Sequence, residues 1–329
     1  MLVRVPEYFD KFECLAGACP HSCCEKWEVV LDEESVALYR RVEGALGEEL
    51  CAAMTVDDEG DVCFPLDGGR CPFLNEENLC RIHLQLGQEA TSVTCREHPR
   101  FTEDYGAFRE ITLSASCPAA NELLLGSREV LTFVDLETEE PAEEADAWLE
   151  TLLPMREELL TVLTDRETDF HLRLGRFLLL AEEQQAWLDE ESCPEHEAAA
   201  LTLPENAMDY LLGLEVLEED WRDILRQAKT VAASDCDPAL LERIAVYFAF
   251  RWLLKAVNDG DLLTRAAFVA FSTLAVERLA GVLGLGEALR RYVCEIEHSG
   301  ENLEALMESL ADGRLCMLPP VNDLSLCKE

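Results

Sequence analysis

Apolar side chains recur at helical spacing through the second half of the chain. Within residues 165–191 they fall at positions 170, 174, 177, 178 and 181, close to a period of about 3.6 residues. Further stretches show the same kind of pattern, and Gly or Pro marks most of the breaks between them. The pattern predicts helices over residues 165–191, 211–228, 238–257, 262–284, 285–299 and 301–312.

The first 130 residues follow a different pattern. Turn-forming residues are frequent, β-capable runs are short (27–31 and 107–113), and one helix is expected after Asp32, whose side chain suits an N-cap. Residues 136–146 are acidic with one proline, which is typical of a solvated connection. We expect a mainly α protein in which a loop-rich module is packed on a helical domain. Its predicted parts are a cysteine-rich metal-binding module (1–130), an acidic linker (131–146) and the helical domain (147–329).

The charge balance narrows the classes of partner. The 329-residue chain is 49% hydrophobic and 29% charged, as globular proteins are, but its 67 acidic and 27 basic residues give a formal net charge of −40. Such a chain is not expected to bind nucleic acid or an anionic membrane, because nothing neutralises phosphates. A lysine-rich protein would be attracted to it. The acidity can equally serve solubility alone.

No targeting or membrane-spanning segment is evident in the sequence. The first residues lack the apolar run of a secretory signal. The longest apolar stretches, 244–254 and 266–276, are shorter than a membrane span. The expected location is the cytoplasm.

Cysteine is unusually frequent, with 15 in the chain and ten of them before residue 130. In a reducing compartment, clustered cysteines favour metal binding over disulfides, and thiolates are soft ligands that select zinc or iron–sulfur clusters. The ten include a closely spaced run and four later positions. Eight thiols can build two four-sulfur sites or one site with spares, and buried cysteines without a metal are the alternative. The predicted metal ligands are Cys14, Cys19, Cys23, Cys24, Cys71, Cys80, Cys95 and Cys117.

Several segments carry a resemblance to a known family. They are PEYFDKFECLAGACPHSCCEKWEVVLDEES, CPFLNEENLCRIHLQLG, TCREHPR, LSASCP, YFAFRWLLKAVNDGDLL and EIEHSGENLEAL. In them the chain resembles the flagellin lysine-N-methylases, while the cysteine part alone is also similar to small CxxxCC proteins described as zinc- or iron-chelating. The resemblance implies methyl transfer from S-adenosylmethionine to flagellin lysines, with a cysteine-ligated iron–sulfur cluster, 4Fe–4S first and zinc as the alternative.

The implied reaction sets a chemical demand on the site. A lysine attacks only as the neutral amine, and its ordinary pKa is about 10.4, so a nearby group must take its proton while the amine is aligned with the donor. Glu297 and His298 near a helix end, with Tyr247, are the candidate catalytic residues. A solvated helix end is the alternative for the Glu297 region, where Glu301 lies one turn on.

Arg251 interrupts an apolar helix one turn after Tyr247, so we expect it to be buried with a partner. It either binds a carboxylate such as that of the methyl donor or forms a structural ion pair with Asp259 or Asp261. The sequence shows no glycine-rich nucleotide-binding signal and no CxxxCxxC motif. How the donor is held therefore stays open, and a pocket where these helices meet the cysteine module is expected.

Two functions from other classes remain open at this stage. The first is a metal-binding, chaperone-like interaction protein that holds basic clients on its acidic surface. The second is an iron–sulfur redox protein.

Overall fold

The computed structural model describes residues 1–25, 29–57, 60–144, 148–193, 196–231 and 234–318. Part of the expected strand at 27–31 thus lies outside the described residues. The chain divides into two compact units. We call Lys11–Phe101 with Cys117–Ala120 the cysteine unit, and Met1–Asp10, Thr102–Ser116 and Asn121–Glu329 the helical unit.

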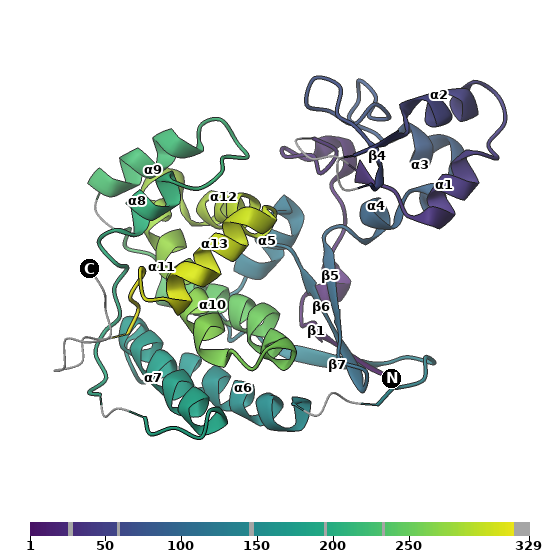
Figure 1. The fold of residues 1–329 in the computed structure, drawn as a ribbon. Coiled ribbons are helices and arrows are strands. Elements are labelled where there is room, and N and C mark those ends of the chain that lie inside the picture. Colours follow the sequence, from purple (N-terminus) through teal and green to yellow (C-terminus); the bar gives the residue numbers. More distant parts are fainter. Residues whose placement is uncertain (26–28, 58–59, 145–147, 194–195, 232–233, 319–329) are drawn as a thin grey trace. The chain divides into compact units, whose positions relative to one another are not determined.

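The helical unit confirms the mainly α fold class (Figure 1). Its helices bundle around α11, which contacts α7, α9, α10, α12 and α13. α11 is long and apolar enough to cross a membrane, but 78% of its most apolar window is buried inside the protein, as in the core helix of a globular domain. The helices are α6 (Leu149–Leu163), α7 (Phe170–Leu188), α8 (Ala207–Leu212), α9 (Trp221–Thr230), α10 (Pro238–Trp252), α11 (Leu262–Leu283), α12 (Leu285–Glu297) and α13 (Gly300–Ala311), and α5 (Pro118–Leu125) begins in the cysteine unit and ends in the helical unit.

Local signals set the helix ends that position the later site. Pro238 stands in the first turn of α10, where its lack of a backbone N–H costs no helical hydrogen bond. The Asp237 side chain caps the helix by accepting a hydrogen bond from the Ala239 N–H. Gly284, at φ +76°, takes the left-handed conformation that separates α11 from α12. Ser299 caps α13 through the Asn302 N–H. The predicted helix over 238–257 is shorter than expected, since its last part is the 3₁₀ helix Leu253–Asn258.

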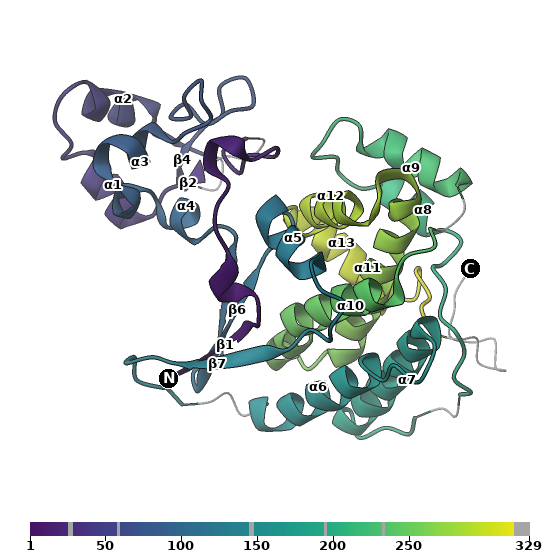
Figure 2. The same cartoon turned by 180° about the vertical axis from the view of Figure 1, so that it is seen from behind.

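Most of a four-stranded sheet with the strand order β5-β6-β1-β7 belongs to the helical unit (Figure 2). β1 (Leu2–Pro6) runs parallel to β6 (Phe108–Leu113) and antiparallel to β7 (Phe133–Glu137). β5 (Arg100–Asp104) lies at the other edge and crosses from one unit to the other.

The sheet corrects the expected domain boundaries. β7 lies within the segment expected to be a linker over 131–146, and β1 and β6 of the expected module belong to the helical unit. β7 is an edge strand with mostly exposed side chains, so its polar sequence looked solvated. Its anchor is Phe133, whose ring stacks on Phe250 at 3.8 Å between centroids.

The cysteine unit is built around a small aromatic core. Tyr39 packs on Phe64 at 5.7 Å and Phe64 on Phe73 at 4.7 Å between ring centroids. Asp32 caps the first helix, as predicted, by accepting from the Ser35 N–H at 2.9 Å. Its elements are β2 (Val29–Val30), α1 (Glu33–Tyr39), α2 (Ala45–Ala53), β3 (Thr55–Val56), β4 (Val62–Phe64), α3 (Arg81–Leu86) and α4 (Val93–Glu97), with 3₁₀ turns at Ala16–Ala18 and Gln88–Ala90.

Candidate functional site: the cysteine groups and a buried ion pair

Four of the predicted ligands lie around one short stretch of backbone. The Cys71 N–H donates to the Cys24 carbonyl at 2.8 Å, the Leu74 N–H donates to the Cys71 carbonyl at 3.0 Å, and Leu74 pairs with Cys80 in an isolated bridge. The Cys95 thiol interacts electrostatically with those of Cys24 and Cys80, and the Cys71 thiol with all three others. We call Cys24, Cys71, Cys80 and Cys95 the first cysteine group.

Capping contacts place Cys95 beside the other three. It lies in α4, and its N–H donates to the Ser92 hydroxyl at 3.3 Å. The Val93 N–H donates to the Asp32 carboxylate at 2.9 Å, and the Thr94 hydroxyl donates to the Val30 carbonyl at 3.0 Å. Asp32 thus holds both α1 and the helix that carries Cys95.

The other four predicted ligands form a second neighbourhood in the same unit. The Ala16 N–H donates to Cys14 Sγ at 3.4 Å, and the Cys19 N–H donates to the Ala16 carbonyl at 3.0 Å, so residues 14–19 form a tight loop. The Cys117 thiol interacts electrostatically with those of Cys19 and Cys14, and the Cys23 thiol interacts with those of Cys24, Cys14 and Cys95. We call Cys14, Cys19, Cys23 and Cys117 the second cysteine group.

Burial and mutual hydrogen bonding set the pKa values of the thiols. Burial raises the pKa of Cys71 to about 12 and that of Cys95 to about 11. A hydrogen bond between the adjacent Cys23 and Cys24 lowers the pKa of Cys24 to about 7 and raises that of Cys23. Thiolates are soft donors that prefer a thiophilic ion. Across the described ranges, no three His, Cys, Asp or Glu side chains converge as the ligands of a bound ion do.

Tyr39 adds a polar atom to the first cysteine group. Its side chain is fully buried, and its hydroxyl has no hydrogen-bond partner within the part of the chain described. Burial and the nearby thiols of Cys95 and Cys80 raise its pKa, so the hydroxyl keeps its proton. A buried donor without an acceptor costs about 1–3 kcal/mol. A charged sulfur on either cysteine would supply the missing acceptor.

In the helical unit, the structure brings together two of the predicted site residues. Arg251 Nε donates to Glu297 Oε2 at 2.6 Å, and the two side chains are only 5% and 0% exposed. Trp252 Nε1 donates to Glu297 Oε1 at 3.2 Å, and Arg251 Nη1 donates to the Thr112 hydroxyl at 3.2 Å. Burial opposes the charge of Arg251, but Glu297 more than offsets it, so the pKa of Arg251 is raised. The buried guanidinium of Arg251 therefore stays charged beside the Glu297 carboxyl group.

The structural partner of Arg251 is thus neither aspartate considered from the sequence. Asp259 binds Arg265 at 2.8 Å, and Asp261 caps α11 by accepting from the Thr264 N–H at 3.0 Å. Both aspartates bind groups at the start of α11, whereas the actual partner of Arg251, Glu297, is the last residue of α12.

Tyr247 and His298 flank the ion pair in different ways. The Tyr247 hydroxyl accepts from the Ala115 N–H at 3.2 Å, and burial raises the pKa of Tyr247, so it stays protonated. His298 is the half-buried C-cap residue of α12. α12 ends at Glu297, whose side chain contacts Arg251, whereas Glu301 is exposed in α13.

Sequence reasoning missed the part of β6 that faces this region. Thr112 contacts Arg251, and Glu110 forms a buried double hydrogen bond with Arg156, at 2.7 and 2.8 Å. Both residues lie two apart on the strand and are buried. The sequence did carry one signal for this site: Glu110 and Thr112 are polar side chains at alternate positions of a short strand, and a serine-containing segment follows them.

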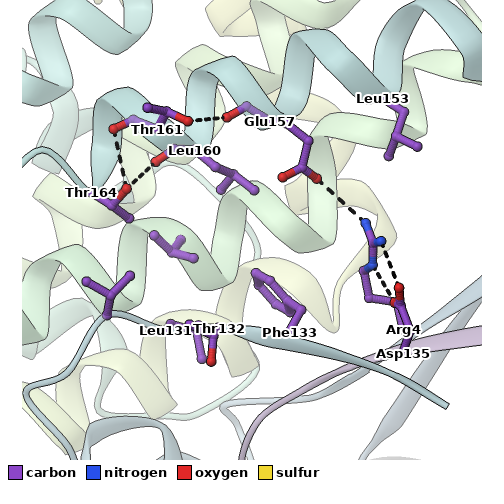
Figure 3. Close-up of a pocket in the computed structure, with 12 residues that line it drawn as sticks. Arg4, Leu131, Thr132, Phe133, Asp135, Leu153, Glu157, Leu160, Thr161 and Thr164 are labelled. Atoms are coloured by element: carbon purple, nitrogen blue, oxygen red, sulfur yellow. Dashed lines mark hydrogen bonds and ion pairs between the residues drawn. The ribbon is translucent and has the colours of Figure 1, made fainter.

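A separate cavity of about 500 Å³ lies between β7 and α6 (Figure 3). Arg4 binds Asp135 at 2.7 Å at one end and approaches Glu157 at 3.6 Å, and Thr161 and Thr164 lie at the other end. The predicted catalytic residues and Arg251 are not among its lining residues.

Comparisons with known proteins support the resemblance to the flagellin lysine-N-methylases. The chain is 28% identical over 135 residues to a flagellar biosynthetic protein FliU of Salmonella muenchen, covering 39% of this chain and 80% of that protein. It is 27% identical over 135 residues to a lysine-N-methylase of Salmonella typhimurium and 28% identical over 141 residues to one of Salmonella choleraesuis. Each match covers 39% of this chain and 34% of the methylase, so the chain matches about a third of each enzyme's length. No family model matches, and neither does any solved structure.

Proposed function

We propose that the protein is an S-adenosylmethionine-dependent lysine N-methyltransferase acting on flagellin. The observation that carries the proposal is the similarity to two proteins named lysine-N-methylase and to a flagellar biosynthetic protein. The presence of the eight cysteines in one unit supports a methylase that also carries a cysteine-ligated metal. The proposed setting is the cytoplasm.

The two cysteine groups would hold the metal of this enzyme. The thiols are soft donors, and the unpartnered Tyr39 hydroxyl suits a charged sulfur beside it. An iron–sulfur cluster would supply electron transfer or a Lewis-acidic iron, whereas zinc would stabilise the unit. The residues' own work is to bind the ion and to release protons as it binds.

Arg251 fits the role of donor anchor poorly as it stands. Its guanidinium already serves Glu297 and Thr112, so a donor carboxylate would have to compete with Glu297. We propose instead that Arg251, Trp252 and Glu297 together fix the end of α12 and thereby position His298. A proton acceptor held in one orientation can be aligned with the substrate amine.

His298 is the proposed proton acceptor, because an imidazole has an ordinary pKa of about 6.5 and suits general-base work near neutral pH. Tyr247 keeps its proton and is proposed to donate a hydrogen bond within the same region. The acidic character of the chain, with a net charge of −40, supports attraction of a lysine-bearing substrate.

Substitution at the ion pair tests the proposed roles. Glu297→Gln nearly preserves shape and removes the charge, so methyl transfer to flagellin should fall while metal content stays, when it is measured at a temperature at which circular dichroism shows the variant folded. Glu301→Gln is the matched control, since that carboxylate is exposed one turn further on, and should keep full activity. Equal activity in the wild type and both variants would contradict the role of Glu297.

A second candidate function is an acidic interaction protein that binds basic clients. The net charge and the name of the flagellar biosynthetic relative favour it. Calorimetry separates the two functions: the methyltransferase binds S-adenosylmethionine, whereas the interaction protein binds flagellin without the donor. An iron–sulfur redox protein would show redox activity and no methyl transfer.

A further inference from the structure

We infer that the cavity between β7 and α6 is a docking groove for a basic side chain on an extended segment of the protein substrate. This inference rests on the proposed function, in which the partner is a lysine-bearing protein, and it adds a substrate-binding site apart from the proposed catalytic residues. The groove has a volume of about 500 Å³, and sites that hold ligands enclose about 300–1,000 Å³. All its lining residues belong to the helical unit.

One face of α6 forms the long wall of the groove (Figure 3). Its lining residues recur at about one helical turn and therefore share that face; they are Leu153, Glu157, Leu160, Thr161 and Thr164. From Leu153 to Thr164 the helix advances by roughly 16 Å, at about 1.5 Å per residue. An extended chain rises by about 3.3 Å per residue, so this wall matches a peptide segment of about five residues.

Contacts outside the groove hold its apolar wall in place. The Phe133 ring stacks on Phe250 at 3.8 Å between centroids. The backbone of Thr132 is fixed as well, because its N–H donates to the Glu7 carboxylate at 2.8 Å and its carbonyl accepts from the Glu7 N–H at 3.0 Å. Val246 of α10 adds a buried side chain to this wall. The stem of a lysine or arginine packs on such a surface while its charged head reaches polar groups at the edge.

The charged end of the groove keeps a carboxylate that a cation can reach. Arg4 is joined to Asp135 by two hydrogen bonds, at 2.7 and 3.1 Å. Within the described residues, the Glu157 carboxylate receives only long contacts, from Arg4 at 3.6 Å and from Arg156 at 3.5 Å, beyond the usual hydrogen-bond range of about 2.7–3.2 Å. Arg156 is itself bound to Glu110, at 2.7 and 2.8 Å. Because the Glu157 side chain is 55% exposed, an incoming ammonium can bind it without breaking a hydrogen bond.

The hydroxyls at the other end of the groove also present acceptors. Thr161 Oγ1 donates to the Glu157 carbonyl at 2.8 Å, and Thr164 Oγ1 donates to the Leu160 carbonyl at 2.9 Å (Figure 3). Since their protons are used inside the helix, both oxygens offer lone pairs to a ligand. An ammonium, a guanidinium or a peptide N–H suits this lining, whereas an anion would meet carboxylate and hydroxyl lone pairs. Charge and hydrogen-bond character together favour a basic segment.

The groove and the proposed catalytic residues lie on different faces of α10. Val246 lines the groove, and Phe250, one turn later, stacks on its wall. Tyr247 and Arg251 directly follow these two residues, and successive helix residues are turned by about 100°. Arg251 binds Glu297 on its own face. The groove should therefore set the affinity for the substrate more than the rate of the chemical step.

Binding of flagellin to the full chain, measured by fluorescence anisotropy, tests the groove. Glu157→Gln removes the charge and nearly preserves shape, and Thr161→Trp fills the groove with an indole ring. Circular dichroism melts first confirm that both variants are folded. We expect each to weaken flagellin binding by about fivefold or more, as for the loss of a charge-assisted contact at a partly exposed site. Glu150→Gln is the matched control, because Glu150 is an exposed residue of α6 outside the lining, and it should bind like the wild type.

A pair of peptides tests the chemistry that the groove recognises. The probe is a short labelled peptide with one lysine between leucines, and its counterpart carries norleucine, which keeps the stem and lacks the ammonium. The wild type should prefer the lysine peptide by about fivefold or more, and Glu157→Gln should lose that preference. Equal binding of the two peptides, or binding of neither, would overturn the inference. Unchanged flagellin affinity in both groove variants, or an equal loss in Glu150→Gln, would overturn it too.

Kinetics separate this inference from the proposed function. In the methylation assay, Glu157→Gln and Thr161→Trp should raise KM for flagellin more than they lower kcat. Flagellin that binds in the groove and receives no methyl groups counts against the methyltransferase alone. Methylation with the same KM in the wild type and both groove variants counts against the groove alone.

Discussion

Removal of either partner of the Arg251–Glu297 pair should destabilise the helical unit strongly. The two side chains are 5% and 0% exposed, and the pair is joined at 2.6 Å. Arg251→Met leaves a buried carboxylate with Trp252 as its remaining donor, and breaking a buried ion pair in this way costs about 3–5 kcal/mol. The double variant Arg251→Met/Glu297→Gln removes both charges, so it should be less destabilised than the sum of the two single variants, by about 1–3 kcal/mol.

Urea denaturation measures these free energies of unfolding, with tryptophan fluorescence reporting the helical unit. The matched control is Arg226→Met, which breaks an ion pair with Asp223 whose side chains are 62% and 72% exposed. An exposed pair contributes about 0–1 kcal/mol, so this variant should unfold almost like the wild type. Additive free energies in the double variant, or a cost for Arg251→Met as small as that of the control, would refute the buried pair.

Three further predictions concern pH, capping and salt. The amount of bound metal should fall as the pH falls, because protons compete with the metal for the same sulfurs. Burial raises the pKa of Cys71 to about 12 and that of Cys95 to about 11, which favours the protonated thiols. A bound-metal content that stays constant from pH 8 to about 5 would contradict this competition. Asp32→Ala should destabilise the cysteine unit by about 0.5–2 kcal/mol. Hydrogen bonds from Val93 and Ser35 hold the native pKa of Asp32 at about 2 against the effect of burial, so its stabilisation should be present above the unfolded pKa of about 3.9 and lost as the pH falls toward the native pKa. Thermal melts of the two proteins at neutral and acid pH measure this difference, and equal melting temperatures at neutral pH would contradict the cap. Binding of flagellin, measured by calorimetry, should weaken with added salt because screening reduces the attraction of a chain with net charge −40; salt-independent affinity would mean that the acidic surface is not a recognition device.

The helices of the second half were predictable because their cores are built from local periodicity. α7, α10, α11, α12 and α13 each bury an apolar face against α11 or its neighbours, and Gly or Pro residues stand near many of their ends. β7 was not predictable in this way, since an edge strand with exposed polar side chains carries little hydrophobic signal. Its place depends on pairing with β1, more than a hundred residues earlier in the chain.

The candidate site was also predictable from the sequence only where local signals define it. The identities of the cysteines were visible in the sequence, but the approach of Cys24, Cys71 and Cys80 depends on backbone contacts between distant turns. The burial of Arg251 was predictable from the apolar helix around it. Its partner was not, because Glu297 lies 46 residues later and reaches Arg251 only through the packing of α12 in the bundle.

The most direct test of the account is whether methyl groups arrive on lysine side chains. Anaerobically purified protein with its metal is incubated with flagellin and S-adenosylmethionine that carries an isotope-labelled methyl group, and the flagellin is mapped by peptide mass spectrometry. The account predicts labelled methyl groups on lysine Nζ atoms of flagellin, dependent on both protein and donor. Flagellin that stays unlabelled while the protein holds its metal and binds flagellin would contradict the methyltransferase and favour the interaction protein.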